Sequence, residues 1–309
     1  MVALGASGIM GIALEETSGT YTAPVKFVPF DSESLKWSQE NVERRPIRNT
    51  PSLVGMIRGD GHIEGDITFD VTVDILIWFL AASRCTYTKT GTAPSLTYKF
   101  TPVPVAVPTK TMSITIKRGN ETSGYTGCVV GGFTLSVDDS GAFKMTVTIV
   151  GNAESTQTAP TAVWPTTLPF GAGMYRLEIP TATQVFDTDK YEFVVEDNAE
   201  AQNRLKNTLG AQFVKFGENS TSVKVERDFE TRAELDQYKA LTAKSLTFQA
   251  IQGTDSVKIE TGVSYIESYE YGLSSVGDLI RASVEYKCAI NAAGNSFELT
   301  VVTSESLPS

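Results

Sequence analysis

Apolar and polar residues alternate along much of this chain. From Ile63 to Val73 and from Val223 to Phe229, apolar side chains recur at alternate positions, with polar, mostly charged residues between them. This period of two is typical of strands with one buried and one solvated face. Many further short segments, separated by Gly, Asn, Asp and Pro, show the same character. The pattern predicts a mainly β protein of sandwich or barrel-like units.

Two segments break the strand pattern at matched places and are predicted to be helices. They cover Asp74 to Ser83 and Arg232 to Thr242, with Thr72 and Thr231 as candidate N-caps. The second has an apolar side formed by Leu235, Tyr238 and Leu241. The first is apolar all round, so we expect its own domain or a neighbour to cover it.

The two halves of the chain follow the same order of elements. Asn49 through Ala81 falls on Asn207 through Lys239 at an offset of 158, and Gln39 falls on Glu196 at 157. Farther on, the segment Phe133 to Ile149 matches Tyr269 to Val284, at an offset of 135 to 136. The order predicts a duplication, although two unrelated β domains are the alternative.

This repetition predicts two tandem units, each with one flanking helix. The first unit covers residues 1–160, with a projecting insertion near 84–108, and the second covers residues 161–309. The Thr- and Pro-rich stretch from Asn152 to Pro169 is the expected linker.

A second projecting segment, Glu43 to Gly61, combines arginines with apolar residues in an otherwise acidic protein. It is either a solvated loop or a contact with the acidic surface of a neighbouring copy, since arginine is enriched at interfaces. The candidate contact residues are Arg44, Arg45, Arg48, Met56, Ile57 and Arg58.

The polar sides of the two alternating strands are rich in carboxylates. They form either an ordinary solvated face or, if the chain assembles, the inner wall of a channel. The candidates for that wall are Asp66, Asp70, Glu226, Asp228 and Glu230.

Charge and cysteine content narrow the function classes. The 309 residues have a formal net charge of −10, which argues against a protein that grips nucleic acid through clustered Lys and Arg. The amino terminus lacks a signal-like segment, and the longest apolar run, Ile75 to Ala82, is too short to span a bilayer. We therefore expect a protein made in the cytoplasm, in which Cys85, Cys128 and Cys288 are free thiols.

No catalytic, metal or cofactor pattern is recognisable. The single histidine, His62, stands in a Gly-Asp-Gly-His context without a nucleophile signature beside it. Asp138 and Asp139 precede Ser140-Gly141, where Asp favours a β-turn, so we interpret them as turn residues. An enzyme is the weakest of the function classes considered.

Several segments together resemble the tail tube proteins of long-tailed bacteriophages. They include the opening Gly11-Ile-Ala-Leu-Glu-Glu-Thr-Ser-Gly-Thr-Tyr-Thr-Ala-Pro24 and the run from Phe27 to Ser34. The segment from Ile63 to Ala82 contributes as well. In the second half the resemblance is carried by Phe170-Gly-Ala, by Val223 to Leu241 and by Ser245-Leu-Thr-Phe.

The resemblance implies a structural virion protein, assembled in the host cytoplasm, whose rings stack into a tube for genome delivery. Its partners would be copies of itself and other tail proteins such as the tape measure, terminator and distal tail proteins. DNA would pass without specific binding, and neither a membrane nor a cofactor is expected. Two units per chain favour a homotrimeric ring with pseudo-sixfold symmetry, with a hexamer as the alternative. A non-viral β-sandwich binding or adhesion module is the rival function.

Overall fold

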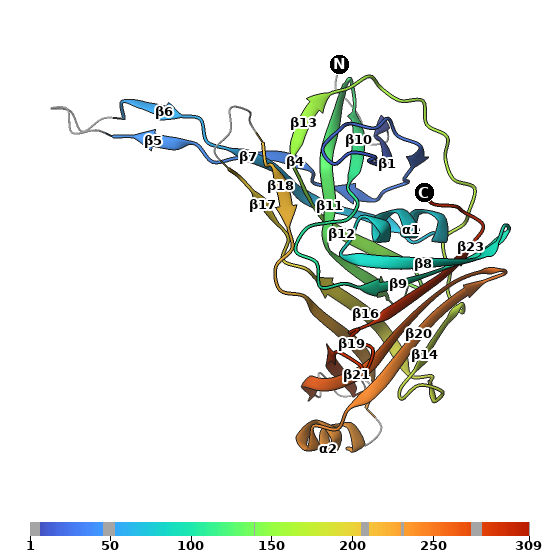
Figure 1. The fold of residues 1–309 in the computed structure, drawn as a ribbon. Helices are drawn as coiled ribbons and strands as arrows, with labels where there is room; N and C mark the ends of the chain where they lie inside the picture. Colours follow the sequence, from blue (N-terminus) through green and yellow to red (C-terminus); the bar gives the residue numbers. More distant parts are fainter. Residues whose placement is uncertain are drawn as a thin grey trace.

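The computed structural model describes residues 7–45, 53–138, 140–204, 210–229, 232–272 and 280–308. Antiparallel strands dominate it and two short helices accompany them, which confirms the expected mainly β fold (Figure 1).

The helices are α1 (Val73–Ala81) and α2 (Ala233–Ala240). The strands of the first half are β1 (Ile9–Leu14), β2 (Lys26–Phe27), β3 (Ser32–Glu33), β4 (Lys36–Gln39), β5 (Val42–Arg44), β6 (Gly55–Ile57), β7 (Gly61–Asp70), β8 (Cys85–Thr92), β9 (Ser95–Pro102), β10 (Met112–Arg118), β11 (Glu121–Val137), β12 (Phe143–Gly151) and β13 (Ala153–Thr156). Those of the second half are β14 (Tyr175–Glu178), β15 (Gln184–Val185), β16 (Thr188–Glu196), β17 (Glu200–Gln202), β18 (Phe213–Lys215), β19 (Ser220–Asp228), β20 (Lys244–Gln252), β21 (Asp255–Gly272), β22 (Arg281–Ala289) and β23 (Glu298–Thr303).

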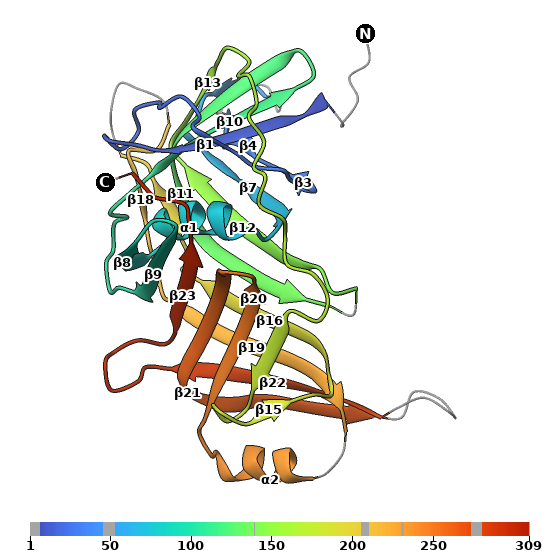
Figure 2. The same cartoon turned by 90° about the vertical axis from the view of Figure 1, so that its right-hand side faces the viewer.

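One long sheet connects the two halves of the molecule. Its strands follow the order β4, β7, β12, β11, β16, β19, β22, β21, and every neighbouring pair is antiparallel. In Figure 2 the sheet descends from β7 and β12 to β21 and β22. Because β16 pairs directly with β11, no sheet edge separates the halves.

The first four strands of this sheet repeat as the last four. The series β4, β7, β12, β11 has the same antiparallel order as β16, β19, β22, β21. A β-bulge interrupts β11 between Val130 and Gly132, and another interrupts β21 between Ile266 and Ser268, 136 residues later. Bulges re-aim a strand at a defined position, so their match indicates the same local geometry in both series.

Strand register corrects two of the sequence alignments. Ser38 lies opposite His62, and Glu196 lies opposite Ser220, so the offset near Gln39 is 158 rather than 157. Val147 faces Ile67 as Val284 faces Val225, which makes Val284 the counterpart of Val147 at an offset of 137. For the second alignment the shift is two residues, and alternation alone cannot separate registers that differ by two, because both keep the same face buried.

The same offset relates two hairpins. In one, β5 pairs with β6 and places Val42 opposite Ile57. In the other, β17 pairs with β18 and places Glu200 opposite Lys215, and both positions lie 158 residues later. The first hairpin extends away from the body, whereas the second lies against it (Figure 1).

The opening motif of the chain is fixed by one buried carboxylate. Glu15 accepts hydrogen bonds from the hydroxyls of Thr111 (2.6 Å) and Ser113 (2.8 Å). It also accepts from the backbone N–H groups of Gly19 (2.7 Å) and Gly127 (2.9 Å). Buried charges require such partners, so Glu15 ties the loop after β1 to β10 and β11.

Helix α1 is buried along its whole length, as its apolar sequence predicts. It packs beneath the sheet and is covered by its own chain, with β8, β21 and β23 among its neighbours. Thr72 is its N-cap, but its side chain makes no capping hydrogen bond. The observed helix ends at Ala81, two residues before the expected end at Ser83.

Helix α2 differs from its amphipathic prediction. Tyr238 and Leu241 are exposed, and the buried residue is Glu234, which pairs with Arg227 at 2.9 Å. Arg232 is the N-cap, and the expected cap Thr231 lies outside the described residues. Of the three residues predicted for the apolar side, Leu235 is half-buried, and the ion pair between Glu234 and Arg227 helps to attach the helix.

Two segments are more ordered than their composition indicates. The expected insertion near 84–108 forms the hairpin β8–β9, but β9 also pairs with β23 and buries Tyr98 and Phe100, so this hairpin is part of the sheet rather than a free arm. The start of the expected linker forms β13, which pairs with β11. One apolar cluster includes residues of both halves, and the boundary near residue 160 stays a prediction.

Candidate assembly surfaces

The long sheet ends at the second half of β21. Residues 265–272 pair with β22 on one side, and no strand in the described part of the chain pairs with their other side. Tyr271 is 51% exposed at this edge and stacks on Phe229, with ring centroids 4.9 Å apart. An exposed edge with an aromatic side chain is a template for pairing with another chain.

The opposite end of the sheet is formed by β3 and β4. Both pair with β7, and among the described strands no other borders them. Arg118 supports this edge from behind, because it binds the Glu33 carboxylate and donates to the carbonyl of Leu35 at 2.8 Å. The hydrogen bonds that Arg118 donates to the Glu33 carboxylate raise the pKa of Arg118. The edge is therefore held in place.

The pairing of β11 with β16 shows how one four-strand series joins the next. Leu135 lies opposite Phe193, and Phe133 lies opposite Val195. The backbone N–H of Asp197 then donates to the carbonyl of Gly131 at 3.0 Å. In this junction β11 is the counterpart of β21, and β16 is the counterpart of β3 and β4.

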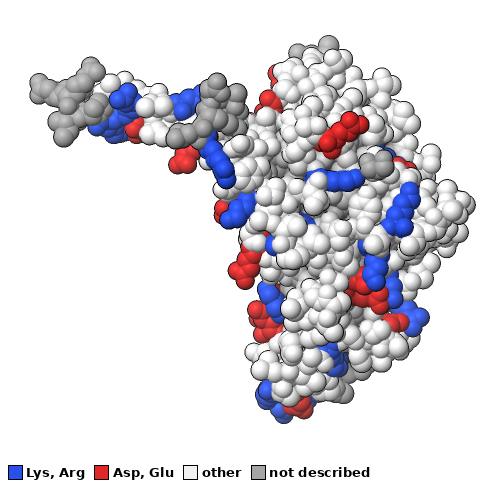
Figure 3. All heavy atoms as spheres, in the orientation of Figure 1, with Lys and Arg blue, Asp and Glu red and all other residues white. Residues whose placement is uncertain are grey.

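The hairpin β5–β6 is hereafter called the arm (residues 42–57, described except for 46–52). It carries exposed Val42, Met56 and Ile57, with basic side chains visible along it in Figure 3. Of the predicted contact residues, Arg44, Arg45, Met56 and Ile57 lie on the arm and Arg58 lies at its base, whereas Arg48 lies outside the described residues. Arg45 pairs with Glu43 at 2.9 Å, and Arg58 donates to Gln39 at 3.2 Å.

The predicted acidic residues share one face of the sheet. Asp66, Asp70 and Glu226 each stand next to a buried apolar residue, Asp228 stands between the half-buried Arg227 and Phe229, and Glu230 lies outside the described residues. Strand register sets one row across seven strands on this polar face, and the row reads Asp70, Lys144, Ser136, Glu192, Lys224, Glu285 and Ser268.

The polar face is thus of mixed charge rather than uniformly acidic. Lys144 approaches Asp70 to 4.0 Å, and Glu226 lies within 4 Å of both Lys190 and Lys224. Lys224 alternates with Glu226 and Asp228 on the same strand, so its place on this face follows from the sequence pattern. Lys144 and Lys190 belong to neighbouring strands, and only strand register sets them beside the acidic residues.

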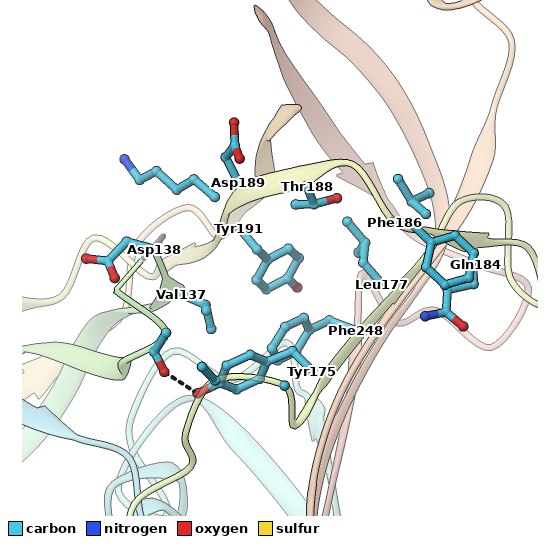
Figure 4. A pocket seen from close by; sticks show the side chains of 15 residues that line it. Val137, Asp138, Tyr175, Leu177, Gln184, Phe186, Thr188, Asp189, Tyr191 and Phe248 are labelled. Atoms are coloured by element: carbon cyan, nitrogen blue, oxygen red, sulfur yellow. Dashed lines mark hydrogen bonds between the residues drawn. The ribbon is translucent and has the colours of Figure 1, made fainter. Parts of the chain in front are cut away.

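A cavity of about 430 Å³ opens where the two strand series meet. Tyr175, Tyr191 and Phe248 form an aromatic wall, and Tyr175 donates to the carbonyl of Gly141 at 2.8 Å (Figure 4). Phe186, 84% exposed, lies at its rim. Asp138, Asp189 and Lys190 also line the cavity, so its lining is mixed polar and apolar, and we assign it no chemistry.

The residues considered for catalysis have local roles. Asp138 accepts hydrogen bonds from the backbone and hydroxyl of Ser140, which hold its pKa below the ordinary value, as expected for the predicted turn; Asp139 lies outside the described residues. His62 lies 3.4 Å from Glu64. In the described part of the chain, no cluster of His, Cys, Asp and Glu is suited to bind a metal, and neither helix could cross a membrane.

The family model described as phage tail tube protein matches residues 5–288, which is most of the chain. None of the curated proteins compared with the chain matches it.

Proposed function

Since the chain belongs to the phage tail tube protein family, a structural component of the virion tail, we propose that its copies close into rings by pairing β21 of one protomer with β4 of the next. The family is structural rather than enzymatic, and it sets aside the adhesion module considered from the sequence. The observation that carries the proposal is the junction of β11 with β16, which already joins two such series within one chain.

That junction supplies a register for the contact between protomers. Glu196 lies opposite Gly132, and their counterparts are Ser38 and Ser268. Continuing the antiparallel register sets Trp37 of one protomer against Tyr269 of the next. The following pair is Lys36 with Glu270.

These predicted neighbours are chemically complementary. Lys36 and Glu270 carry opposite charges, and directly opposed charges of unlike sign stabilise an antiparallel pair. Trp37 and Tyr269 would form an aromatic cross-strand pair on the other face. Closing the ring also removes the two free edges, which lowers the risk of uncontrolled sheet growth.

The proposed ring contains three copies of the chain. Each chain holds two four-strand series, so a trimer presents six similar series around one axis. Its rotational symmetry closes the ring, whereas the head-to-tail contact between rings is heterologous and extends into a tube. Other tail proteins would bind the two ends of this tube.

The polar face is proposed to line the channel. Asp66, Asp70, Glu226 and Asp228 lie on it among lysines, and over the described strands the acidic side chains outnumber the basic ones. Excess negative charge disfavours binding of the phosphate backbone, and the neighbouring lysines reduce the strength of the negative potential. Genome DNA could then pass without specific contacts.

The outer side of the arm is proposed to contact the next ring. Val42 and Ile57 are 56% and 48% exposed, whereas their counterparts in the second hairpin, Glu200 and Lys215, are exposed and charged. An exposed apolar pair at positions that are charged in the counterpart marks a contact that the second hairpin does not make.

Disulfide cross-linking tests the ring. Ser38 and Ser268 are predicted to form a non-hydrogen-bonded pair, in which Cα atoms are about 4.5 Å apart and side chains are close. Ser38→Cys with Ser268→Cys should therefore link protomers on oxidation, and denaturing gels without reductant should show products up to three chains and no larger.

The matched control is Ser38→Cys with Glu270→Cys, a diagonal pair about 7 to 8 Å apart that should link poorly. The three native cysteines should not form disulfides under these conditions. Burial raises the pKa of Cys85 to about 12 and that of Cys288 to about 11, and it raises that of Cys128 as well. Six-chain products would overturn the trimer. Absence of any linked product, with no rings in negative-stain images, would overturn the edge pairing.

A further inference from the structure

We propose that the arm binds the polar face of β21 and β22 in the neighbouring protomer, in the position that hairpin β17–β18 takes on β11 and β12 within one chain. The partner is a second copy of this protein. The inference rests on the proposed ring, because that ring brings β4 of one protomer beside β21 of the next.

The two hairpins have the same backbone plan. Val54 N–H donates to the Arg44 carbonyl at 3.1 Å, and Gln212 N–H donates to the Gln202 carbonyl at 2.9 Å, each 158 residues later. A glycine lies at the base of both, Gly59 and Gly217. There a Cβ atom would lie 1.6 Å from the carbonyl oxygen of Glu40 and 2.9 Å from that of Asn198. The second hairpin is therefore a template for the first.

The second hairpin is bound through an apolar contact. Val214 and Phe216 are each 2% exposed and pack with Val129 and Val150, at the end of the polar face of β11 and β12. Ala199 packs beside Gly131, where a Cβ atom would lie 2.7 Å from the alanine methyl. The hairpin thus covers the part of β11 and β12 that lies beyond the end of the β11–β16 pairing.

Both halves of the corresponding contact are exposed in the single chain. Met56 is the counterpart of Val214 and is 59% exposed. Tyr265, opposite Lys287 in the sheet, is the counterpart of Val129 and is 38% exposed. Setting Met56 against Tyr265 would bury two apolar side chains that one protomer leaves in water, and a sulfur near an aromatic ring is favourable.

The charges around this pair are complementary. Arg58 is the counterpart of Phe216, and its side chain donates a hydrogen bond to Gln39. Gln39 is the counterpart of Asp197, whose backbone N–H donates to the carbonyl of Gly131. Glu267, which is exposed, takes the place of Gly131. Arg58 of one protomer therefore comes beside Glu267 of the next.

A second pair follows from the same register. Glu43 corresponds to Ala201, and Lys287 corresponds to Val150. In the proposed contact between chains, Glu43 and Lys287 are therefore charged, whereas their counterparts in the contact within one chain, Ala201 and Val150, are apolar. Surfaces that stay in water before assembly are more polar than a permanent core, which accounts for the difference.

Cross-linking and charge exchange test the arm in the full chain. Met56→Cys with Tyr265→Cys should form a disulfide between chains in assembled protein. Ile57→Cys with Tyr265→Cys should not, because neighbouring residues of a strand point to opposite faces. In the Met56→Cys and Tyr265→Cys background, Arg58→Glu should slow cross-linking about five- to tenfold, and adding Glu267→Arg should restore it.

The pair Ser38→Cys and Ser268→Cys separates the two proposals. If that pair links chains and Met56→Cys with Tyr265→Cys does not, the arm contact is wrong while the ring stands. If the Ile57 control links as efficiently as Met56, the proposed face of the arm is wrong. If neither Ser38 with Ser268 nor Met56 with Tyr265 links, both the ring and the arm contact fail.

Discussion

Single residues differ between the two hairpins according to what covers each one. Met56 stands in water where Val214 is enclosed, and Ile57 is apolar where Lys215 is charged. A residue that only had to solubilise the arm would be polar at both positions. These substitutions indicate that the arm is covered after assembly rather than within one chain.

Asp197 shows how the enclosed hairpin is held at its base. Its side chain is 3% exposed, accepts a hydrogen bond from Asn219 at 2.7 Å and lies 3.8 Å from Arg84. Burial raises its pKa above the ordinary 3.8, because desolvation outweighs both partners. Folding therefore favours the protonated form of this carboxyl.

We predict a pH dependence from this shift. A carboxyl with a raised folded pKa contributes stability that is fully present below pH 3.8 and is lost as the pH rises through the folded pKa. Asp197→Asn lacks this dependence, so the free energy of unfolding of the natural chain relative to the variant should fall as the pH rises above about 3.8. Urea denaturation of both proteins across that range measures it. A difference that is constant or rises with pH would contradict the burial argument.

Among the elements, the two hairpins should respond differently to shortening. Glu40 and Asp60 continue the β4–β7 register, so residues 41–59 can be replaced by Asn-Gly, which favours a two-residue turn. The arm has few buried contacts, so we expect a folded monomer with a melting temperature within a few degrees of the natural chain. Tubes should be absent in electron micrographs, and normal tubes from this variant would refute the role of the arm.

The matched change replaces residues 199–217, which occupy the equivalent stretch of the second hairpin. It removes Val214 and Phe216 and exposes Val129 and Val150. We expect a loss of about 3 kcal/mol or more in the free energy of unfolding, since four apolar side chains lose their mutual burial. Equal effects of the two deletions on stability would contradict the distinction between an enclosed and an exposed hairpin.

For the whole molecule, the polar face is the proposed route of the genome. Exchanging Asp66, Asp70, Glu226 and Asp228 for lysine should slow DNA release from reconstituted particles and make it depend more steeply on salt, because cations bind phosphates with counterion release. A control with the same change in charge exchanges Glu16, Glu121, Glu154 and Asp236, all exposed and outside the proposed channel face. Equal slowing in both sets would show that overall charge, rather than the channel wall, governs release.

The sequence by itself determined the features that depend on near neighbours in the chain. Alternation predicted β7 and β19 and their buried sides, an apolar run predicted the buried α1, and the 158-residue offset predicted that one order of elements occurs twice. The arm was recognisable as a projecting segment because basic, apolar and glycine residues occur together between Glu43 and Gly61. Local period and turn chemistry fix such features before any long-range contact forms.

Tertiary structure alone decided which strands are neighbours. Pairing joins β11 to β16, although about sixty residues separate them in the sequence, and this leaves β4 and β21 as the free edges. Lys144 enters the row of Asp70 only through strand register, and Tyr265 is exposed because no hairpin in the described part of the chain covers it as β17–β18 covers Val129. Exposure and charge on a sheet depend on residues contributed from distant segments, so the surfaces proposed for assembly became visible only in the folded chain.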